Sequence, residues 1–184
     1  MKVYEVQSQL GHYQCFEPAE KANRESLRKL AVFDGSPRRE NWTPPAVQLL
    51  YPSLAPPDFW FIPPAAAFAL ERHTIEKLGH PIRNAGEYLP LPFKNHALQL
   101  LNITQVFDAL DTRNSQYPSG AAGGLPARFA FHTHLIGATL FKVPQTAASQ
   151  ILCAEWSGDP HEEFKAAVER LGLKGVRFEL LWES

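Results

Sequence analysis

Eight of the chain's sixteen prolines fall within residues 37–64. Proline has no backbone N–H to donate and restricts the residue before it, so neither a helix nor a central strand can run through this stretch. A disordered linker would not carry the large apolar side chains found here, which are Trp42, Leu49, Leu50, Tyr51, Phe59, Trp60 and Phe61. We therefore predict an extended segment, the proline belt (residues 37–64), that covers the core and contains a short edge strand at residues 58–62.

Residues 98–111, LQLLNITQVFDALD, predict a buried strand that runs into a turn of helix. Leu98, Leu100 and Ile103 supply the short apolar run of a strand. In the second half, apolar residues recur at the i, i+1 and i+4 spacing of a helical turn, at positions 106, 107 and 110. Such a stretch is mostly scaffold and says more about the fold than about the function.

The other regular elements follow from alternation and from helix-stop signals. A helix is predicted for residues 63–78, with prolines in its first turn and with Gly79 and Pro81 at its end. Residues 23–33 fit either a helix or a strand that enters a turn, and we favour the helix. Apolar alternation and β-rich composition predict further strands at residues 2–8, 88–91, 129–134, 138–143 and 150–156.

The C-terminal part has the clearest pattern. Asp159 is predicted to cap a helix, with Glu162 three residues later completing a capping box. The apolar positions 164, 167, 168 and 171 form one face of that helix, and Gly172 suits the left-handed residue after it. Residues 176–182 then alternate as a half-buried final strand, with Val176, Phe178, Leu180 and Trp182 on one face.

These elements are mixed without a regular strand–helix–strand alternation, which favours an α+β fold: a mostly antiparallel sheet with a few packed helices. The length of 184 residues is that of one domain, so residues 1–184 are predicted to form a single domain. The formal net charge of −1 supplies no bulk field for nucleic acid or an anionic membrane, and we expect neither as a partner.

The two cysteines, Cys15 and Cys153, are far apart in the sequence and lack metal-ligand spacing. We interpret them as reduced thiols in a reducing compartment, and a disulfide is the alternative. The N-terminus alternates like a strand and has no apolar core of a signal peptide. The most apolar uncharged stretch, residues 59–70, is too short to span a bilayer. A cytoplasmic location is therefore expected.

No pattern of residues predicts an active site. His132 and His134 lie about 7 Å apart on one face of the predicted strand, as paired metal ligands often do, but no third ligand lies nearby in the sequence. The glycine-rich residues 119–126 lack the GK[ST] ending of a phosphate loop, and G-x-S-x-G is absent. Helix capping and solvation account for the acidic pairs at 108/111 and 162/163. We expect no catalytic residue, no metal and no cofactor.

Exposed aromatics and arginines on loops are typical of binding surfaces. Arg38, Arg39 and Trp42 lie in the proline belt, and Arg113 and Tyr117 flank the glycine-rich loop. We predict that these five residues contact a partner protein. The alternative for Trp42 is that its side chain packs against the core.

Residues 58–184 resemble a family of bacterial immunity proteins from polymorphic toxin systems, the eleventh immunity class, formerly a domain of unknown function. The matching pieces, in the family's order, are DFWFI, EYLPL, LQLLNITQVFDALD, LFKVP and FKAAVERLGLKGVRFELLW. Residues 1–57 match poorly. The resemblance implies a non-enzymatic protein that binds one cognate toxin or effector and blocks it by occlusion.

Two alternatives stay open from the sequence. One is a small hydrolase or metal-dependent enzyme that uses the His132/His134 face. The other is a ligand-binding or structural accessory domain of a secretion system. The sequence does not determine the oligomeric state.

Overall fold

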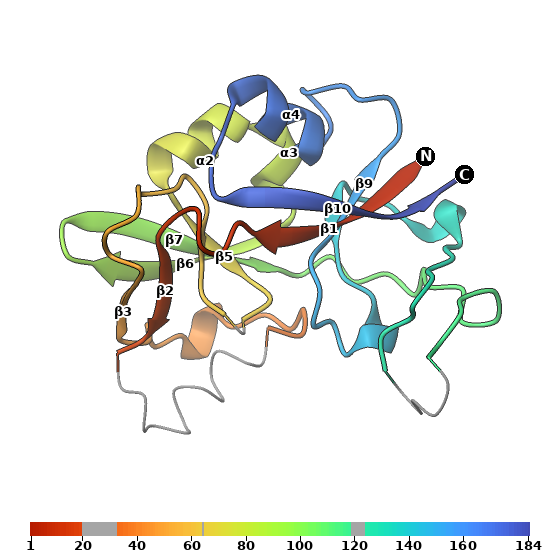
Figure 1. Ribbon diagram of the computed structural model, residues 1–184, viewed down its shortest axis with the longest axis horizontal. Coiled ribbons are helices and arrows are strands. Elements are labelled where there is room, and N and C mark those ends of the chain that lie inside the picture. The colour runs from red at the N-terminus through yellow and green to blue at the C-terminus, as the bar shows by residue number, and fades with distance from the viewer. Residues whose placement is uncertain (20–32, 64, 119–123) are drawn as a thin grey trace.

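The computed structural model describes residues 1–19, 33–63, 65–118 and 124–184. These residues form an α+β domain built from antiparallel sheets and short helices, which confirms the predicted fold class. The first sheet has the order β10-β1-β9-β8, and its strands are Val176–Glu183, Lys2–Ser8, Leu152–Glu155 and Leu140–Phe141. The two chain ends therefore lie side by side (Figure 1).

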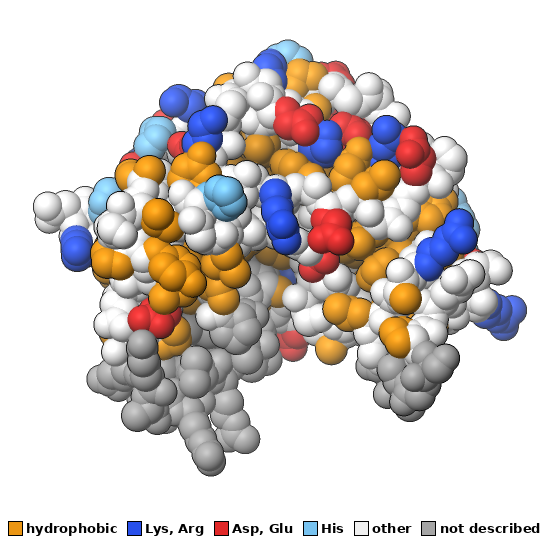
Figure 2. Space-filling view, viewed as in Figure 1, with side chains coloured by type: hydrophobic (Ala, Val, Ile, Leu, Met, Phe, Trp, Pro, Cys, Tyr) orange, Lys and Arg blue, Asp and Glu red, His pale blue; other side chains and the backbone are white. Residues whose placement is uncertain are grey.

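The second sheet has the order β4-β5-β7-β6, with strands Trp60–Phe61, Phe68–Glu71, His96–Ile103 and Gly86–Phe93. A small third sheet pairs β2 (Cys15–Pro18) with β3 (Val47–Leu50). Phe16 of β2 stacks on Trp60 of β4, with ring centroids 5.0 Å apart. The proline belt thus covers part of the core, as predicted, and apolar side chains gather on the surface over β2 and β3 (Figure 2).

Three α-helices are described, α2 (Arg72–Leu78), α3 (His80–Arg83) and α4 (Phe164–Leu171), besides the 3-10 helices η1 (Arg39–Asn41), η2 (Thr133–Leu135) and η3 (Pro144–Thr146). The main apolar cluster joins both large sheets to these α-helices. Phe164 at the start of α4 is fully buried in it, and its ring packs against the rings of Phe59, Phe68 and Phe178.

Five predicted strands are present within a few residues of their expected bounds: β1, β6, β7, β9 and β10. The predicted edge strand of the belt is β4, which pairs only with β5. Strand β8 is shorter than predicted. Gly172 ends α4 in the left-handed conformation, with φ of 61°, as expected. The prediction for residues 23–33 lies outside the described residues except at Phe33.

The predicted helix at residues 63–78 is wrong in its first half. Phe68, Ala69 and Leu70 belong to β5, which lies between β4 and β7, and none of the three is exposed to solvent. A segment buried on both faces has no polar side, so its apolar run carries no period that separates helix from strand. The helix begins only at Arg72.

Residues 106–110 do not form the predicted helical turn. Val106 bridges to Lys142, and Leu110 bridges to Phe131, so this segment is extended and runs along other parts of the chain. Residues 129–134 are also not a regular strand, because they form that single bridge and then enter η2. Tertiary pairing overrides the local pattern at both places.

The last strand, β10, departs from simple alternation at a bulge. Val3 of β1 pairs with Trp182, whereas the next residue, Tyr4, pairs with Leu180, so Leu181 is the extra residue. Trp182 consequently packs against Phe131 on the opposite face of the sheet from Phe178. The expectation that Phe178 and Trp182 share a face is therefore wrong.

Lys142, which follows β8, is a fully buried cation. Its Nζ donates hydrogen bonds to the backbone carbonyls of Phe33 and Ala66, at 2.9 Å for Ala66, and it has no carboxylate at ion-pair distance among the described residues. A neutral amine has two N–H groups and can satisfy both carbonyls. Burial lowers the pKa of Lys142 from 10.5 to about 8.

The first prediction is that replacing Lys142 by Met removes a pH-dependent part of the stability. The folded-state pKa lies below the unfolded value of 10.5, so the unfolded chain keeps its proton longer and wild-type stability gains from rising pH between these values. Relative to Lys142→Met, the wild type should gain about 2 kcal/mol between pH 8 and pH 9.5. Urea unfolding of both proteins measures the difference, and a constant difference would contradict the buried, titrating amine.

The second prediction concerns Phe164. Phe164→Ala should lower the free energy of unfolding by about 3–5 kcal/mol, because the phenyl ring is fully buried. Phe178→Ala should cost less, since this side chain is only half-buried. Urea titration of the two variants measures both losses. A loss below about 1 kcal/mol at Phe164 would contradict its central position.

Candidate functional site

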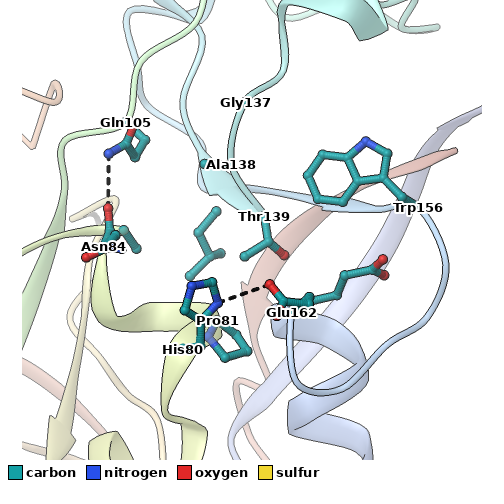
Figure 3. Close-up of a pocket in the computed structure, with 12 residues that line it drawn as sticks. His80, Pro81, Asn84, Gln105, Gly137, Ala138, Thr139, Trp156 and Glu162 are labelled. Carbon is teal, nitrogen blue, oxygen red and sulfur yellow. Dashed lines mark hydrogen bonds and ion pairs between the residues drawn. The ribbon is translucent and has the colours of Figure 1, made fainter.

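A cleft of about 380 Å³ opens where the two large sheets and the helices meet (Figure 3). One wall comes from α3 and the residues after it, and another from residues 137–140, which lead into β8. The remaining wall is the turn before α4, here called the acidic loop (residues 156–163, WSGDPHEE). Gln105, which follows β7, also lines the cleft, so four sequence-distant segments meet here, which sequence reasoning did not predict.

Trp156 lies at the rim of this cleft (Figure 3). It follows the buried strand β9 directly, yet it is 45 % exposed. Tryptophan is among the residue types most enriched at the centre of protein-binding surfaces, and this indole is exposed beside a cleft.

Glu163 fixes the conformation of the acidic loop from inside. Its side chain is 2 % exposed, and its carboxylate accepts hydrogen bonds from the backbone N–H of Ser157 at 2.7 Å, the Ser157 hydroxyl at 2.8 Å and the N–H of Gly158 at 2.9 Å. Burial alone would raise the pKa of Glu163, but these hydrogen bonds outweigh it and the pKa is lowered. The carboxylate is therefore ionised at neutral pH.

Two expectations about the acidic loop are wrong, one about Glu163 and one about Asp159. Solvation does not account for Glu163, because its carboxylate is buried inside the turn. Asp159 does not cap α4 either: its carbonyl accepts the N–H groups of Glu162 and Glu163, and the helix starts later, at Phe164. The Phe164 N–H bonds instead to the Thr139 hydroxyl, at 2.9 Å, which ties the acidic loop to the opposite wall of the cleft.

An ion pair crosses between two walls of the cleft. The His80 Nδ1 of α3 lies 3.2 Å from the Glu162 Oε2 of the acidic loop (Figure 3). Both side chains are more than half exposed, so the pair is screened by water and adds little stability. Glu162 is thus available to a charged group of a ligand.

The cleft is suited to a cationic group. The acidic loop exposes the carboxylates of Asp159 and Glu162 and contains no Lys or Arg. An indole face next to a carboxylate attracts an arginine or lysine side chain through cation–π and ionic contacts together. The cleft thus presents an exposed indole and an exposed carboxylate, the two kinds of group that bind a basic side chain.

The three predicted partner-binding residues of the proline belt surround a second, smaller hollow of about 290 Å³ or lie next to it. Arg38 and Trp42 line it, and Arg39 is exposed beside them. The Trp42 indole N–H donates to the Pro90 carbonyl at 2.8 Å, and the Arg38 guanidinium lies 5.3 Å from the centre of the Phe33 ring. Trp42 is therefore half-buried: part of its indole packs against the neighbouring apolar side chains and part stays accessible to solvent.

Arg113 and Tyr117 are both exposed. The segment that carries them, residues 112–118, lies on the opposite side of the view in Figure 1 from the 3-10 helix of the proline belt. The turn before them is held by Asp111, which is buried and accepts hydrogen bonds from Arg113 N and from the backbone and side chain of Asn114. The Asn114 side chain is the main cause of the lowered pKa of Asp111. The structure does not bring the five predicted residues into one surface, and their partner contacts stay a prediction.

The two histidines do not lie on a strand. His132 precedes η2 and His134 lies within it, both are exposed, and their ring centroids are 6.0 Å apart. A carboxylate that is distant in the sequence approaches them, since Asp111 Oδ2 lies 3.9 Å from His132 Nδ1. Among the residues that the structure describes, no group of three or more His, Cys, Asp or Glu side chains is arranged to hold a metal ion.

The chain matches no protein-family model, and it matches no curated protein sequence. The immunity-protein assignment therefore remains a proposal. In the described part of the chain, none of the helices combines the length and the apolar character needed to cross a membrane. Cys15 and Cys153 are both free and buried.

A signal for Trp156, though not for the cleft itself, was present in the sequence. Trp156 precedes Ser-Gly-Asp-Pro, as Trp42 follows Ser-Pro-Arg-Arg-Glu-Asn, so the rule that selected Trp42 applies to it equally. Trp156 is instead predicted only as the last residue of the strand at residues 150–156. No sequence signal distinguishes the buried Glu163 from its exposed neighbour Glu162.

The third prediction is that Glu163→Gln loosens the acidic loop and destabilises the fold by about 1–3 kcal/mol at neutral pH, because buried N–H groups lose a charged acceptor. The lowered pKa means that this stabilisation is present above pH 4.5 and is lost as pH falls through the folded-state pKa. The free energy of unfolding of the variant, measured by urea titration, should therefore fall less steeply with decreasing pH than that of the wild type. Glu162→Gln, at the exposed neighbour, is the control and should change stability little.

Proposed function

We propose that this protein is an immunity protein that binds a cognate bacterial toxin or effector in the cytoplasm and neutralises it by occlusion, without catalysing a reaction. The resemblance of residues 58–184 to the immunity family supports the class. The observation that carries the proposal is the cleft with the exposed Trp156 at its rim and Glu162 beside it. Binding hot spots commonly contain a tryptophan next to a pocket from which water is excluded on binding.

The partner would insert a basic side chain into the cleft. An arginine fits best, because its planar guanidinium stacks on an indole face and pairs with a carboxylate at the same time. Toxins that act on nucleic acids or nucleotides use such basic residues to hold phosphates, so covering one with an acidic loop blocks the substrate path. The surrounding interface should have the usual size of about 800 Å² on each partner.

The proline belt is proposed as a second contact surface. Arg38, Arg39 and Trp42 lie in the part of the chain that the resemblance covers poorly, and loops held by a rigid scaffold are where recognition residues concentrate. Arg113 and Tyr117 lie on a separate surface and would contact only a partner that reaches around the molecule.

The fourth prediction tests the cleft. The partner to use is the toxin domain encoded next to this gene, in a long secreted protein with a variable C-terminal domain. Trp156→Ala should weaken its binding about 30-fold or more, the effect of losing a hot spot of about 2 kcal/mol, with an unchanged melting temperature because the side chain is exposed. Glu162→Arg should weaken binding, because the new arginine repels the basic side chain that the partner inserts into the cleft. Isothermal titration calorimetry measures both.

Leu135→Ala is the control, since Leu135 is an apolar residue that is 42 % exposed and is part of neither the cleft lining nor the proline belt. Arg39→Ala tests the belt in the same series. Unchanged toxin affinity in both Trp156→Ala and Glu162→Arg would refute the cleft as the contact surface. If Arg39→Ala alone weakens binding, the belt is the interface. A chain that gives no protection against the toxin would refute the proposed function itself.

A further inference from the structure

Strand β10 forms an outer edge of the first sheet and pairs only with β1 among the described strands. It is eight residues long and contains no proline. An edge strand of this kind presents a row of unpaired N–H and C=O groups to which another strand can add.

The other outer strands of the two large sheets are covered or short, unlike β10, and the third sheet consists of two four-residue strands, β2 and β3. Strand β6 carries Pro90 and Pro92, and the Trp42 indole N–H takes the Pro90 carbonyl. Strand β8 is short, and Lys142 next to it exchanges backbone hydrogen bonds with Gln105 and Phe107, at 2.8 and 2.9 Å. Strand β4 has two residues. Within the described residues, β10 is therefore the long edge that remains open.

The charges on β10 are placed unfavourably in the single chain. Glu179 pairs directly with Glu5 of β1, and two like charges opposite each other destabilise a sheet. Neither carboxylate has a cation at ion-pair distance within the described chain. Arg177, two residues from Glu179 on the same face, pairs with the neutral Gln7 and donates to its side chain at 2.6 Å. A cation on the open side of Glu179 would relieve this arrangement.

We infer that two copies of this chain associate through antiparallel pairing of their β10 strands, with Phe178 of one copy opposite Phe178 of the other. In this register Arg177 of each copy lies opposite Glu179 of its partner, so one two-fold axis generates two Arg–Glu pairs. A C2 interface needs a self-complementary surface, and the sequence Arg177-Phe178-Glu179 has this property.

The apolar side chains of β10 fit the same register. Leu180 lies on the face of Val176 and Phe178 but is 48 % exposed, because it lies beyond the helix-covered core. Pairing places it opposite Val176 of the partner and covers it. The bulge at Leu181 then ends the regular edge, which limits the pairing to Val176, Arg177, Phe178, Glu179 and Leu180 of each copy.

Beyond the paired residues, the end of the strand from Leu180 to Glu183 borders a hollow of about 430 Å³ whose other wall carries Gln116 and Arg128. The proposed pairing therefore stops before this wall. Positive and negative side chains lie close together on the face that contains β1 and β10 (Figure 2). This mixed pattern suits a strand of mixed charge, such as β10 itself, better than a strongly basic partner.

The test is the mass in solution over a dilution series, measured by sedimentation equilibrium. The wild type should approach twice the chain mass of 20.6 kDa at high concentration. Arg177→Glu and Glu179→Arg should each weaken the dimer roughly tenfold or more, because two favourable pairs become two unfavourable ones. Mixing these two variants should restore association as a heterodimer, since both Arg–Glu pairs are then complementary again.

Lys77→Glu, a charge reversal at an exposed position of α2, is the control and should leave the wild-type mass unchanged. Circular dichroism establishes that each variant is folded, and Glu179→Arg should not lower stability because it removes the contact between Glu5 and Glu179. A wild type that stays monomeric throughout the series would overturn the inference. A dimer that neither charge reversal weakens, or no heterodimer on mixing, would overturn this register.

Discussion

The contact on which the rest of the structure depends is the packing of Phe164 between the two large sheets. Its ring meets Phe59 at the end of the proline belt, Phe68 of the second sheet and Phe178 of the first sheet. One side chain therefore holds together parts of the chain that the sequence separates by more than a hundred residues. The same residue starts α4, and its N–H binds Thr139, so the position of the acidic loop follows from the position of this ring.

The sequence predicts the fold where an element has one buried and one exposed face. Helix α4 and the first residues of β10, up to Glu179, are of this kind, and their apolar periods are visible in the sequence. Prediction fails where burial is complete or where long-range pairing decides. Phe68, Ala69 and Leu70 have no polar side, and Val106 and Leu110 are held by bridges to Lys142 and Phe131. A local pattern contains no information about those partners.

The same distinction applies to the candidate site. Loop arginines and tryptophans can be selected from the sequence, and Arg38 and Trp42 do line a hollow. The cleft could not be found in this way, because its walls come from α3, from residues 137–140 and from the acidic loop. Whether an acidic residue is solvated or buried depends on which N–H groups the fold brings to it. Glu163 has three hydrogen-bond donors and Glu162 faces solvent, although the two are adjacent and identical in type.

Helix α4 connects the two surfaces proposed here, because the acidic loop precedes it and β10 follows it. Both surfaces contain features that do not help the isolated chain to fold. The Trp156 indole is exposed and so contributes little hydrophobic stabilisation, and the like charges of Glu179 and Glu5 opposite each other lower the stability of the sheet. Residues that do not stabilise the fold are expected at functional surfaces, such as those that bind a partner. Such residues occur at the cleft rim and on the open edge of β10. Both proposals rest on charge complementarity, with a basic side chain of a partner at the cleft and Arg177 of a second copy opposite Glu179 at the strand.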